Sequence, residues 1–387
     1  MRIFSSALIA LTLFCFFLSA KTAYSVVYYV SSGGNDSNDG LSPDTPWQSL
    51  AKVNSMVSSF PVGTQVLFKR GDKFTGTLTI SKSGTAGNEM LFGSYGTGEL
   101  PVITGTTVLT GWTVHSGNIY VRNFTDTLGH LYANGKLMTI ARFPNSRFLA
   151  TDYANSVVAF DDAELTQPSG YWNQVNCRIR TGNWCYESRT VSSYTPGHEN
   201  LSTATQNYIY PKAGYYFDNK LMLLDTAGEY FYDKAAGKLY FYAPGGVDPN
   251  TITVEAAVTK YGVYVTLNRS HIIIQDLKFS RFRDNCIEIY TASNVRVQRC
   301  TIEYAGKFGM RINGSNHVVD NNLIEDNIGT ALTGVFTNGT VSNNSINRTA
   351  LKAGYGEDAW GSHGMQFYTS TGTTCTNNVI DSTGYTG

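Results

Sequence analysis

Acidic side chains recur at one position in the last third of the chain, directly after short apolar segments. Glu303 and Glu325 occupy this position in two successive segments. If the segments stack as strands, the two backbones lie about 4.8 Å apart. Two carboxyl groups that close can differ in proton affinity, so that one donates a proton and the other acts as base or nucleophile, as glycosidic bond cleavage requires. The alternative is that both extend into water or bind Lys307 and Arg348.

A long polar segment between Asn347 and His363 carries further candidate groups. The apolar residues that close the flanking segments, Ile346 and Ile380, are farther apart than the pair before them, which leaves a dozen extra residues. Loops that extend from a regular scaffold often carry binding groups, although a solvated turn without a function is the alternative. Acids in this region could also form the wider carboxylate pair of an inverting mechanism. The additional catalytic candidates are Asp326, Glu357, Asp358 and His363, and the binding candidates in the long segment are Lys352, Tyr355 and Trp360.

A second row of polar residues is predicted on the strands that follow these turns. It occupies the third position of the patterns CIEI, GMRI, ALTG and GMQF, and consists of Glu288, Arg311, Thr333 and Gln366. Glu288 and Arg311 either form an ion pair between strands or bind sugar hydroxyls and a uronate carboxylate. A lyase would use Arg311 to neutralise that carboxylate and His363 or Lys352 to remove the adjacent proton. Uronate lyase or epimerase is therefore the second functional hypothesis.

These candidates meet only if the backbone repeats its conformation, and the sequence contains such a repeat. Its closing apolar residues are Phe279, Ile302, Ile324, Ile346 and Ile380, at intervals of 23, 22, 22 and 34. A period of about 22 residues is too short for two-helix repeats and predicts a coil of short strands and turns. Asn322, Asn344 and Asn378 precede the last three closing residues by two positions and predict a ladder of stacked amides. Residues 256–387 number 132, enough for 6 coils; a sandwich of β-hairpins is the alternative.

The region before the repeat predicts a cap for the coil. After Pro46, apolar residues at helical spacing (Trp47, Leu50, Val53 and Val57) predict one amphipathic helix, and short strands are expected at 66–68, 78–80, 90–92 and 102–103. A helix at the open end of a coil covers unpaired strand edges and the apolar interior. Nearby, Asn35, Asp36, Asn38 and Asp39 could hold a calcium ion or simply form turns. No other cofactor is expected.

The first 25 residues predict an export signal. Arg2 precedes an apolar run at 7–18 that is too short to span a bilayer, and the small residues Ala23 and Ser25 suit a signal peptidase. The mature protein is expected to be secreted or exposed at the cell surface. Five cysteines then remain, an odd number that excludes a complete disulfide framework. Cys177 and Cys185 are expected to pair across a hairpin, whereas Cys286, Cys300 and Cys375 are expected to be small core residues.

Composition narrows the class of partner. The chain has 29 basic and 29 acidic residues, so it lacks the overall charge that attracts nucleic acid or an anionic membrane. It also has 25 tyrosines, and aromatic residues make up 13% of the total. Partly exposed tyrosine rings provide flat apolar faces that suit sugars, although tyrosine is also common in strands for its propensity alone. A polysaccharide or oligosaccharide is the expected partner, and the protein is expected to be a monomer.

Several segments resemble a known superfamily. The opening YYVSSGGNDSNDGLSPDTPWQSL, the repeats that carry the three asparagines, and the export signal together resemble secreted right-handed parallel β-helix proteins of the pectate-lyase-like superfamily. The segments LYANGKLMTIARFPN (131–145) and GEYFYDKAAGKLYFYAPGG (228–246) resemble the β-rich insertion of β-helix proteins associated with glycoside hydrolysis. The resemblance implies an all-β chain built around a right-handed parallel β-helix solenoid with an N-terminal helical cap and an inserted β-rich module.

The resemblance divides the chain into four expected parts. They are a signal peptide at 1–25, the cap and first coils at 26–129, the inserted module at 130–250 and further coils at 251–387. Gly387 falls where the next strand would start, so we expect a C-terminal truncation of a longer protein. The first functional hypothesis is a secreted enzyme that hydrolyses a neutral polysaccharide with paired carboxylates. Because this fold also hosts proteins without catalytic activity, a carbohydrate-binding scaffold or surface adhesin is the third hypothesis.

Overall fold

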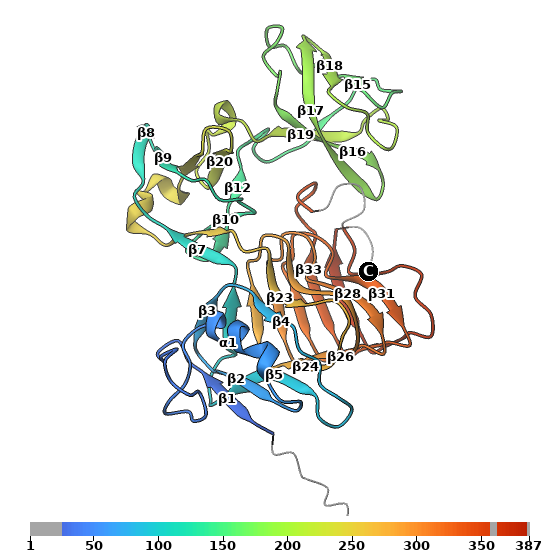
Figure 1. Ribbon diagram of the computed structural model, residues 1–387. Helices are drawn as coiled ribbons and strands as arrows, with labels where there is room; N and C mark the ends of the chain where they lie inside the picture. Colours follow the sequence, from blue (N-terminus) through green and yellow to red (C-terminus); the bar gives the residue numbers. More distant parts are fainter. Residues whose placement is uncertain (1–24, 357–361, 385–387) are drawn as a thin grey trace, which may run out of the picture.

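The computed structural model describes residues 25–356 and 362–384, and its main body is a coil of parallel strands (Figure 1). Successive turns of the coil contribute strands to two parallel sheets. The first sheet contains β1 (Val27–Val30), β2 (Gln65–Lys69), β4 (Leu78–Ile80), β5 (Met90–Tyr95), β23 (Tyr261–Val265), β24 (Arg269–Gln275), β26 (Asn285–Gln298), β28 (Met310–Ser315), β29 (Val318–Asp320), β31 (Leu332–Thr337), β32 (Thr340–Ser342), β34 (Met365–Phe367) and β35 (Thr374–Thr376). The second contains β3 (Lys73–Thr75), β6 (Val102–Thr104), β25 (Lys278–Ser280), β27 (Thr301–Glu303), β30 (Leu323–Glu325), β33 (Ser345–Thr349) and β36 (Val379–Thr383).

The strand register confirms the predicted repeat. The five closing apolar residues pair directly with one another from strand to strand of the second sheet: Phe279, Ile302, Ile324, Ile346 and Ile380. The first four are fully buried and belong to one continuous core that runs along the inside of the coil. Because side chains alternate across a strand, the residues on either side of them face outward. The alternative of a hairpin sandwich is wrong for this region, because the strands pair in parallel.

The asparagine ladder is also confirmed. The amide nitrogen of Asn322 donates to Asn344 Oδ1 over 2.9 Å, and that of Asn344 donates to Asn378 Oδ1 over 2.8 Å. Each amide oxygen also accepts from the backbone nitrogen one coil earlier, for example Asn322 N to Asn344 Oδ1 at 3.0 Å. These bonds satisfy backbone groups at a corner of the coil that would otherwise be buried without a partner.

The predicted helix forms at the N-terminal end of the coil. It comprises α1 (Leu50–Met56) and a 3-10 turn (Val57–Ser59), and begins at Leu50 because the Ser49 hydroxyl accepts from Lys52 N. Its apolar residues Leu50, Val53 and Val57 are buried in the same core as the strands. The helix therefore covers the interior of the coil, as a cap does.

The turn before the helix supports it through a carboxylate. Asp36 accepts hydrogen bonds from the backbone nitrogens of Gln48 and Ser49, at 2.8 and 3.0 Å. Asp39 accepts from Leu41 N and the Thr45 hydroxyl, at 3.1 and 2.9 Å. Both carboxylates, considered above as calcium ligands, thus serve as turn-forming acceptors.

Antiparallel sheets lie between β6 and β23 and project from the coil as a separate module (Figure 1). The division of the chain into domains remains a prediction, but the strands that leave the coil run from residue 106 to residue 257. They are β7 (Thr106–Leu109), β8 (Thr113–Ser116), β9 (Ile119–Asn123), β10 (Leu131–Ala133), β11 (Lys136–Leu137), β12 (Thr139–Ile140), β13 (Arg142–Phe143), β14 (Leu149–Ala150), β15 (Ala159–Asp161), β16 (Asn176–Gly182), β17 (Cys185–Thr195), β18 (His198–Leu201), β19 (Gly214–Asp218), β20 (Glu229–Asp233), β21 (Lys238–Tyr242) and β22 (Val254–Ala257), with 3-10 turns at Leu221–Leu223, Pro244–Gly246 and Pro249–Thr251. They enclose two apolar cores of their own.

Two cysteine predictions are wrong. Cys177 and Cys185 are buried in the β16–β17 hairpin and form no disulfide with each other, because the hairpin register places Cys177 opposite Arg189. Cys375 is exposed, since its strand β35 pairs on one side only, with β32, among the described strands. Cys286 and Cys300 are buried in the core, as expected. The proposed export signal lies outside the described residues, apart from Ser25, and no described helix is long and apolar enough to cross a membrane.

Candidate active site

The predicted row of polar side chains is present on the outer face of the second sheet. Glu303 and Glu325 pair directly on the adjacent strands β27 and β30. The strands on either side add the remaining members of the row, Ser280, Asn347 and Asp381. The coil therefore brings together acids that are separated by a full turn of the repeat in the sequence.

Glu303 is held by groups from the preceding coil. Its two carboxylate oxygens accept from the Ser280 hydroxyl at 2.8 Å and from Lys278 Nζ at 2.9 Å. The residue is only 8% exposed. The partner is Lys278 rather than the predicted Lys307, because Lys278 lies on the strand next to β27 and faces the same way. These two donors hold the carboxylate of Glu303 in place.

A second row begins one residue later, at the corner of the coil. Arg281, Tyr304, Asp326 and Arg348 occupy equivalent positions in successive coils and have positive φ angles of 61°, 54°, 53° and 48°. This left-handed conformation turns the chain sharply, so that the side chains of successive coils meet at the corner.

Arg348 connects the two rows. Its guanidinium binds both oxygens of Asp326, at 2.8 and 2.9 Å, and Glu325 Oε2 at 2.6 Å. Such a bidentate contact, with a further bond to Glu325, holds both carboxylates in fixed positions. The sequence alternative in which Arg348 binds Glu325 is therefore present in the structure, and it includes Asp326 as well.

A pocket of about 250 Å³ opens beside this cluster. Coil residues form most of its wall, and β11 of the module supplies Lys136 and Leu137. Its lining consists of Lys136, Leu137, Tyr304, Asp326, Asn327, Ile328, Arg348, Leu351 and Lys352. The pocket thus lies where the module meets the coil and has a carboxylate, two kinds of cation and an aromatic ring in its wall. Active and binding sites commonly have this location and this mixture of apolar and polar groups.

The long turn after β33 attaches to the module. The hydroxyl of Tyr355, a predicted binding residue, accepts a hydrogen bond from Ile140 N at 2.9 Å, and its ring stacks on His130 at 6.0 Å between centroids. Burial lowers the pKa of His130 to about 4, and Arg178 nearby acts in the same direction. Tyr355 therefore holds the turn against the module, while Lys352 in the same turn faces the pocket.

Of the other predicted residues of this turn, His363 alone lies in the described part of the chain. Glu357, Asp358 and Trp360 lie outside the described residues. His363 is half-buried and its carbonyl accepts from Ala331 N at 3.2 Å.

The second predicted row is in register on the first sheet: Glu288, Arg311, Thr333 and Gln366 pair on β26, β28, β31 and β34. Arg311 forms the simpler of its two predicted arrangements, an ion pair with Glu288 at 2.9 Å. Glu288 is buried, and Asn285 Nδ2 also donates to it. Residues 304–309 connect β27, which carries Glu303, to β28, which carries Arg311. The two polar rows therefore lie on different sheets, on either side of this turn.

Sequence reasoning did not identify three residues near the cluster. Lys278 could have been found from the register, because it precedes the closing residue Phe279 on an adjacent strand. Tyr304 directly follows Glu303 and could have been found in the same way. Lys136 comes from the module, and no sequence pattern indicates that it lies near Asp326. Within the described ranges, no group of three or more His, Cys, Asp or Glu side chains is arranged to hold a metal ion.

Comparison with known proteins agrees with this architecture. Residues 261–387 match the family described as right handed beta helix region. The coil is a right-handed β-helix. A solved structure described as a glycoside hydrolase matches 84% of this chain and 74% of its own, with a TM-score of 0.69 and 16% identity. The structure of XylC in complex with xylose matches 91% of this chain and 58% of its own, with a TM-score of 0.53 and 14% identity. Both likenesses extend over most of this chain and concern its fold.

A curated relative is similar in sequence to part of this chain. Lacto-N-biosidase from Bifidobacterium longum subsp. longum is 29% identical over 160 residues, which are 40% of this chain and 9% of that protein. The chain therefore spans a small fraction of that relative's length.

Proposed function

We propose that this β-helix protein is a secreted carbohydrate-active enzyme that hydrolyses glycosidic bonds of a polysaccharide. One observation carries the proposal: Asp326, bound to Arg348 together with Glu325, lines a pocket between the coil and the module. The similarity to a lacto-N-biosidase and the shared fold with a glycoside hydrolase support the same class of reaction.

The contacts suggest a separate role for each acidic residue. Because Arg348 holds the carboxylates of Asp326 and Glu325 in fixed positions, these residues suit the role of nucleophile or base. Glu303, which is buried against Lys278, suits a positioning role beside Glu325. The proton donor then comes from another acid, and Glu357 and Asp358 are our candidates from the sequence. His363 remains an additional candidate for proton transfer.

The pocket lining fits a neutral sugar. The ring of Tyr304 offers an apolar face, and Lys136 and Lys352 offer donors for hydroxyl groups. Trp360 and the row that contains Arg311 and Gln366 remain proposed substrate-binding groups. A neutral plant, algal or microbial polysaccharide is the proposed substrate.

The test is to incubate the full-length protein with a polysaccharide panel and to follow both new reducing ends and the absorbance of unsaturated uronates. We expect reducing ends without new absorbance. The variants Asp326→Asn and Glu325→Gln are expected to lower turnover about 10²–10⁴-fold, the usual contribution of a positioned acid–base group.

Asp276→Asn is the matched control. Asp276 also has a positive φ at a corner of the coil, and Arg299 binds both of its oxygens, at 2.9 and 2.8 Å. It is therefore equivalent in structure but lies outside the pocket. Equal turnover in the wild type and in the Asp326→Asn and Glu325→Gln variants would show that other acids carry the reaction. Growing absorbance would instead indicate the uronate lyase, and binding without either signal would indicate a noncatalytic carbohydrate-binding protein.

A further inference from the structure

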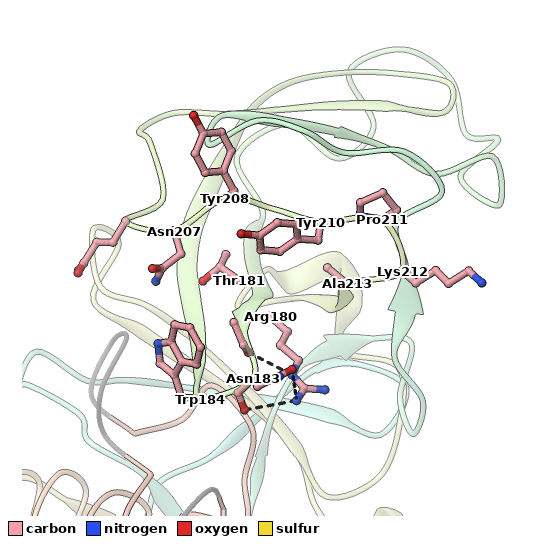
Figure 2. Close-up of a pocket in the computed structure, with 12 residues that line it drawn as sticks. Arg180, Thr181, Asn183, Trp184, Asn207, Tyr208, Tyr210, Pro211, Lys212 and Ala213 are labelled. Carbon is pink, nitrogen blue, oxygen red and sulfur yellow. Dashed lines mark hydrogen bonds between the residues drawn. The ribbon is translucent and has the colours of Figure 1, made fainter.

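We propose that the module carries a second saccharide-binding site, separate from the acidic pocket, which recognises a neutral sugar chain without cleaving it. It occupies a pocket of about 580 Å³ between the end of the β16–β17 hairpin and the segment 206–213 (Figure 2). Sugar binding at this pocket can be measured without turnover, so this site is tested independently of the proposed hydrolysis.

Aromatic rings form the apolar part of this pocket. Trp184, Tyr208 and Tyr210 line it and are 37%, 55% and 58% exposed. A single exposed aromatic side chain is common on a protein surface, but three that line one pocket form a contiguous apolar surface of the kind that marks a binding site. In Figure 2, the Tyr210 ring extends across the middle of the pocket and Trp184 lies at its lower edge. The faces of such rings suit the C–H faces of a pyranose.

Amides and hydroxyls form the polar part, and no carboxylate of the described residues lines the pocket. Asn183 and Gln206 contribute amide groups that can donate and accept hydrogen bonds, whereas the Thr181 hydroxyl and Asn207 Nδ2 donate to Glu187. Arg180 is directed at the hairpin turn, where its Nε donates to Gly182 O at 3.2 Å and its Nη2 to Asn183 O at 3.3 Å. Lys212 points away from the pocket in Figure 2. This lining favours a ligand with hydroxyl groups and no charge.

A buried carboxylate fixes the floor of the pocket. Glu187 is fully buried and accepts from the backbone nitrogens of Gln206 and Asn207, at 2.7 and 3.2 Å. It also accepts from the Thr181 hydroxyl at 2.6 Å and binds Arg189 at 2.6 Å. These bonds hold the two sides of the pocket in one arrangement before any ligand binds. A site that is ordered in advance loses less entropy on binding.

The test is affinity electrophoresis of the full-length protein in gels that contain arabinoxylan, galactan, glucomannan or mixed-linkage β-glucan, with polygalacturonate as the charged comparison. All variants carry Asp326→Asn, so that binding is read without turnover and a failure of the proposed hydrolysis is distinguished from a failure of this site. We expect retention by at least one neutral polysaccharide. Trp184→Ala and Tyr210→Ala should each weaken it about tenfold or more, as truncation of a central aromatic anchor does.

Tyr153→Ala is the control, because Tyr153 is an equally exposed tyrosine of the module that does not line the pocket. Its variant should be retained like the parent protein. Thermal melting of each variant separates a loss of binding from a loss of folding, and Tyr210→Phe provides a milder second variant that keeps the ring. Retention on none of the neutral gels, or unchanged retention of folded Trp184→Ala and Tyr210→Ala, would overturn the proposal.

Discussion

At the scale of single residues, Glu199 is a buried carboxyl group whose oxygens have no hydrogen-bond partner among the described residues. Burial, reinforced by Asp162 and Asp161, raises its pKa to about 8, from an ordinary value of 4.5. The folded protein therefore binds this proton more tightly than the unfolded chain does. The associated stability is present in full below pH 4.5 and is lost as the pH rises towards 8.

We expect Glu199→Gln to be more stable than the wild type at pH 8.5, by about 1–3 kcal/mol, because the glutamine cannot ionise. The gain should shrink as the pH falls and disappear near pH 4.5. Urea unfolding at several pH values measures it, and Glu164→Gln, an exposed position of the same module, is the control. A difference that stays constant with pH would contradict the assignment of a raised pKa.

At the scale of elements, the asparagine ladder holds one corner of the coil. Asn344 satisfies the backbone nitrogen of Asn322, the carbonyl of Val319 at 3.0 Å and the side chains above and below it. Asn344→Ala leaves several buried groups without partners, so we expect a loss of about 2–4 kcal/mol in the free energy of unfolding. Asn347→Ala on the same coil should cost much less, because that side chain donates only to Ser345 Oγ among the described contacts. An equal loss of unfolding free energy in both variants would show that the ladder does not stabilise the coil more than Asn347 does.

At the scale of the whole molecule, β16 of the module contacts the turn that follows β33 of the coil (Figure 1). Arg178 binds the fully buried Asp218 and donates to Gly354 O, while the Tyr216 hydroxyl donates to Ala353 O at 2.6 Å. Because the acidic pocket is lined by both parts, its shape depends on this junction.

Arg178→Ala should destabilise the protein by about 3–5 kcal/mol, since it leaves Asp218 as a buried charge without its cation. It should also speed proteolytic cleavage of the turn at 351–356, because the turn loses one of its contacts with the module, the bond from Arg178 to Gly354 O. Unfolding and limited proteolysis measure the two effects, and Arg180→Ala, an exposed position of the same strand, should change either by little. Normal stability of Arg178→Ala would show that the junction does not rely on this ion pair.

The sequence by itself determined the coil, its register and its cap. A regular repeat with an apolar residue at one position leaves a single way to bury that residue in every turn, so Phe279, Ile302, Ile324 and Ile346 stack as predicted. The same register placed Glu303 beside Glu325 and Glu288 beside Arg311. Local spacing was sufficient because each coil packs on the one before it.

The tertiary structure alone decided which of these groups face a pocket and which cations bind them. Lys136 reaches the neighbourhood of Asp326 only through the docking of the module, and Tyr355 is occupied by Ile140 and His130 for the same reason. The predicted disulfide between Cys177 and Cys185 is wrong, because the hairpin register places each cysteine opposite another residue. That register depends on the sheet as a whole. Contacts between the coil and the module join residues far apart in the chain without any shared period, and the sequence holds no local pattern that records them.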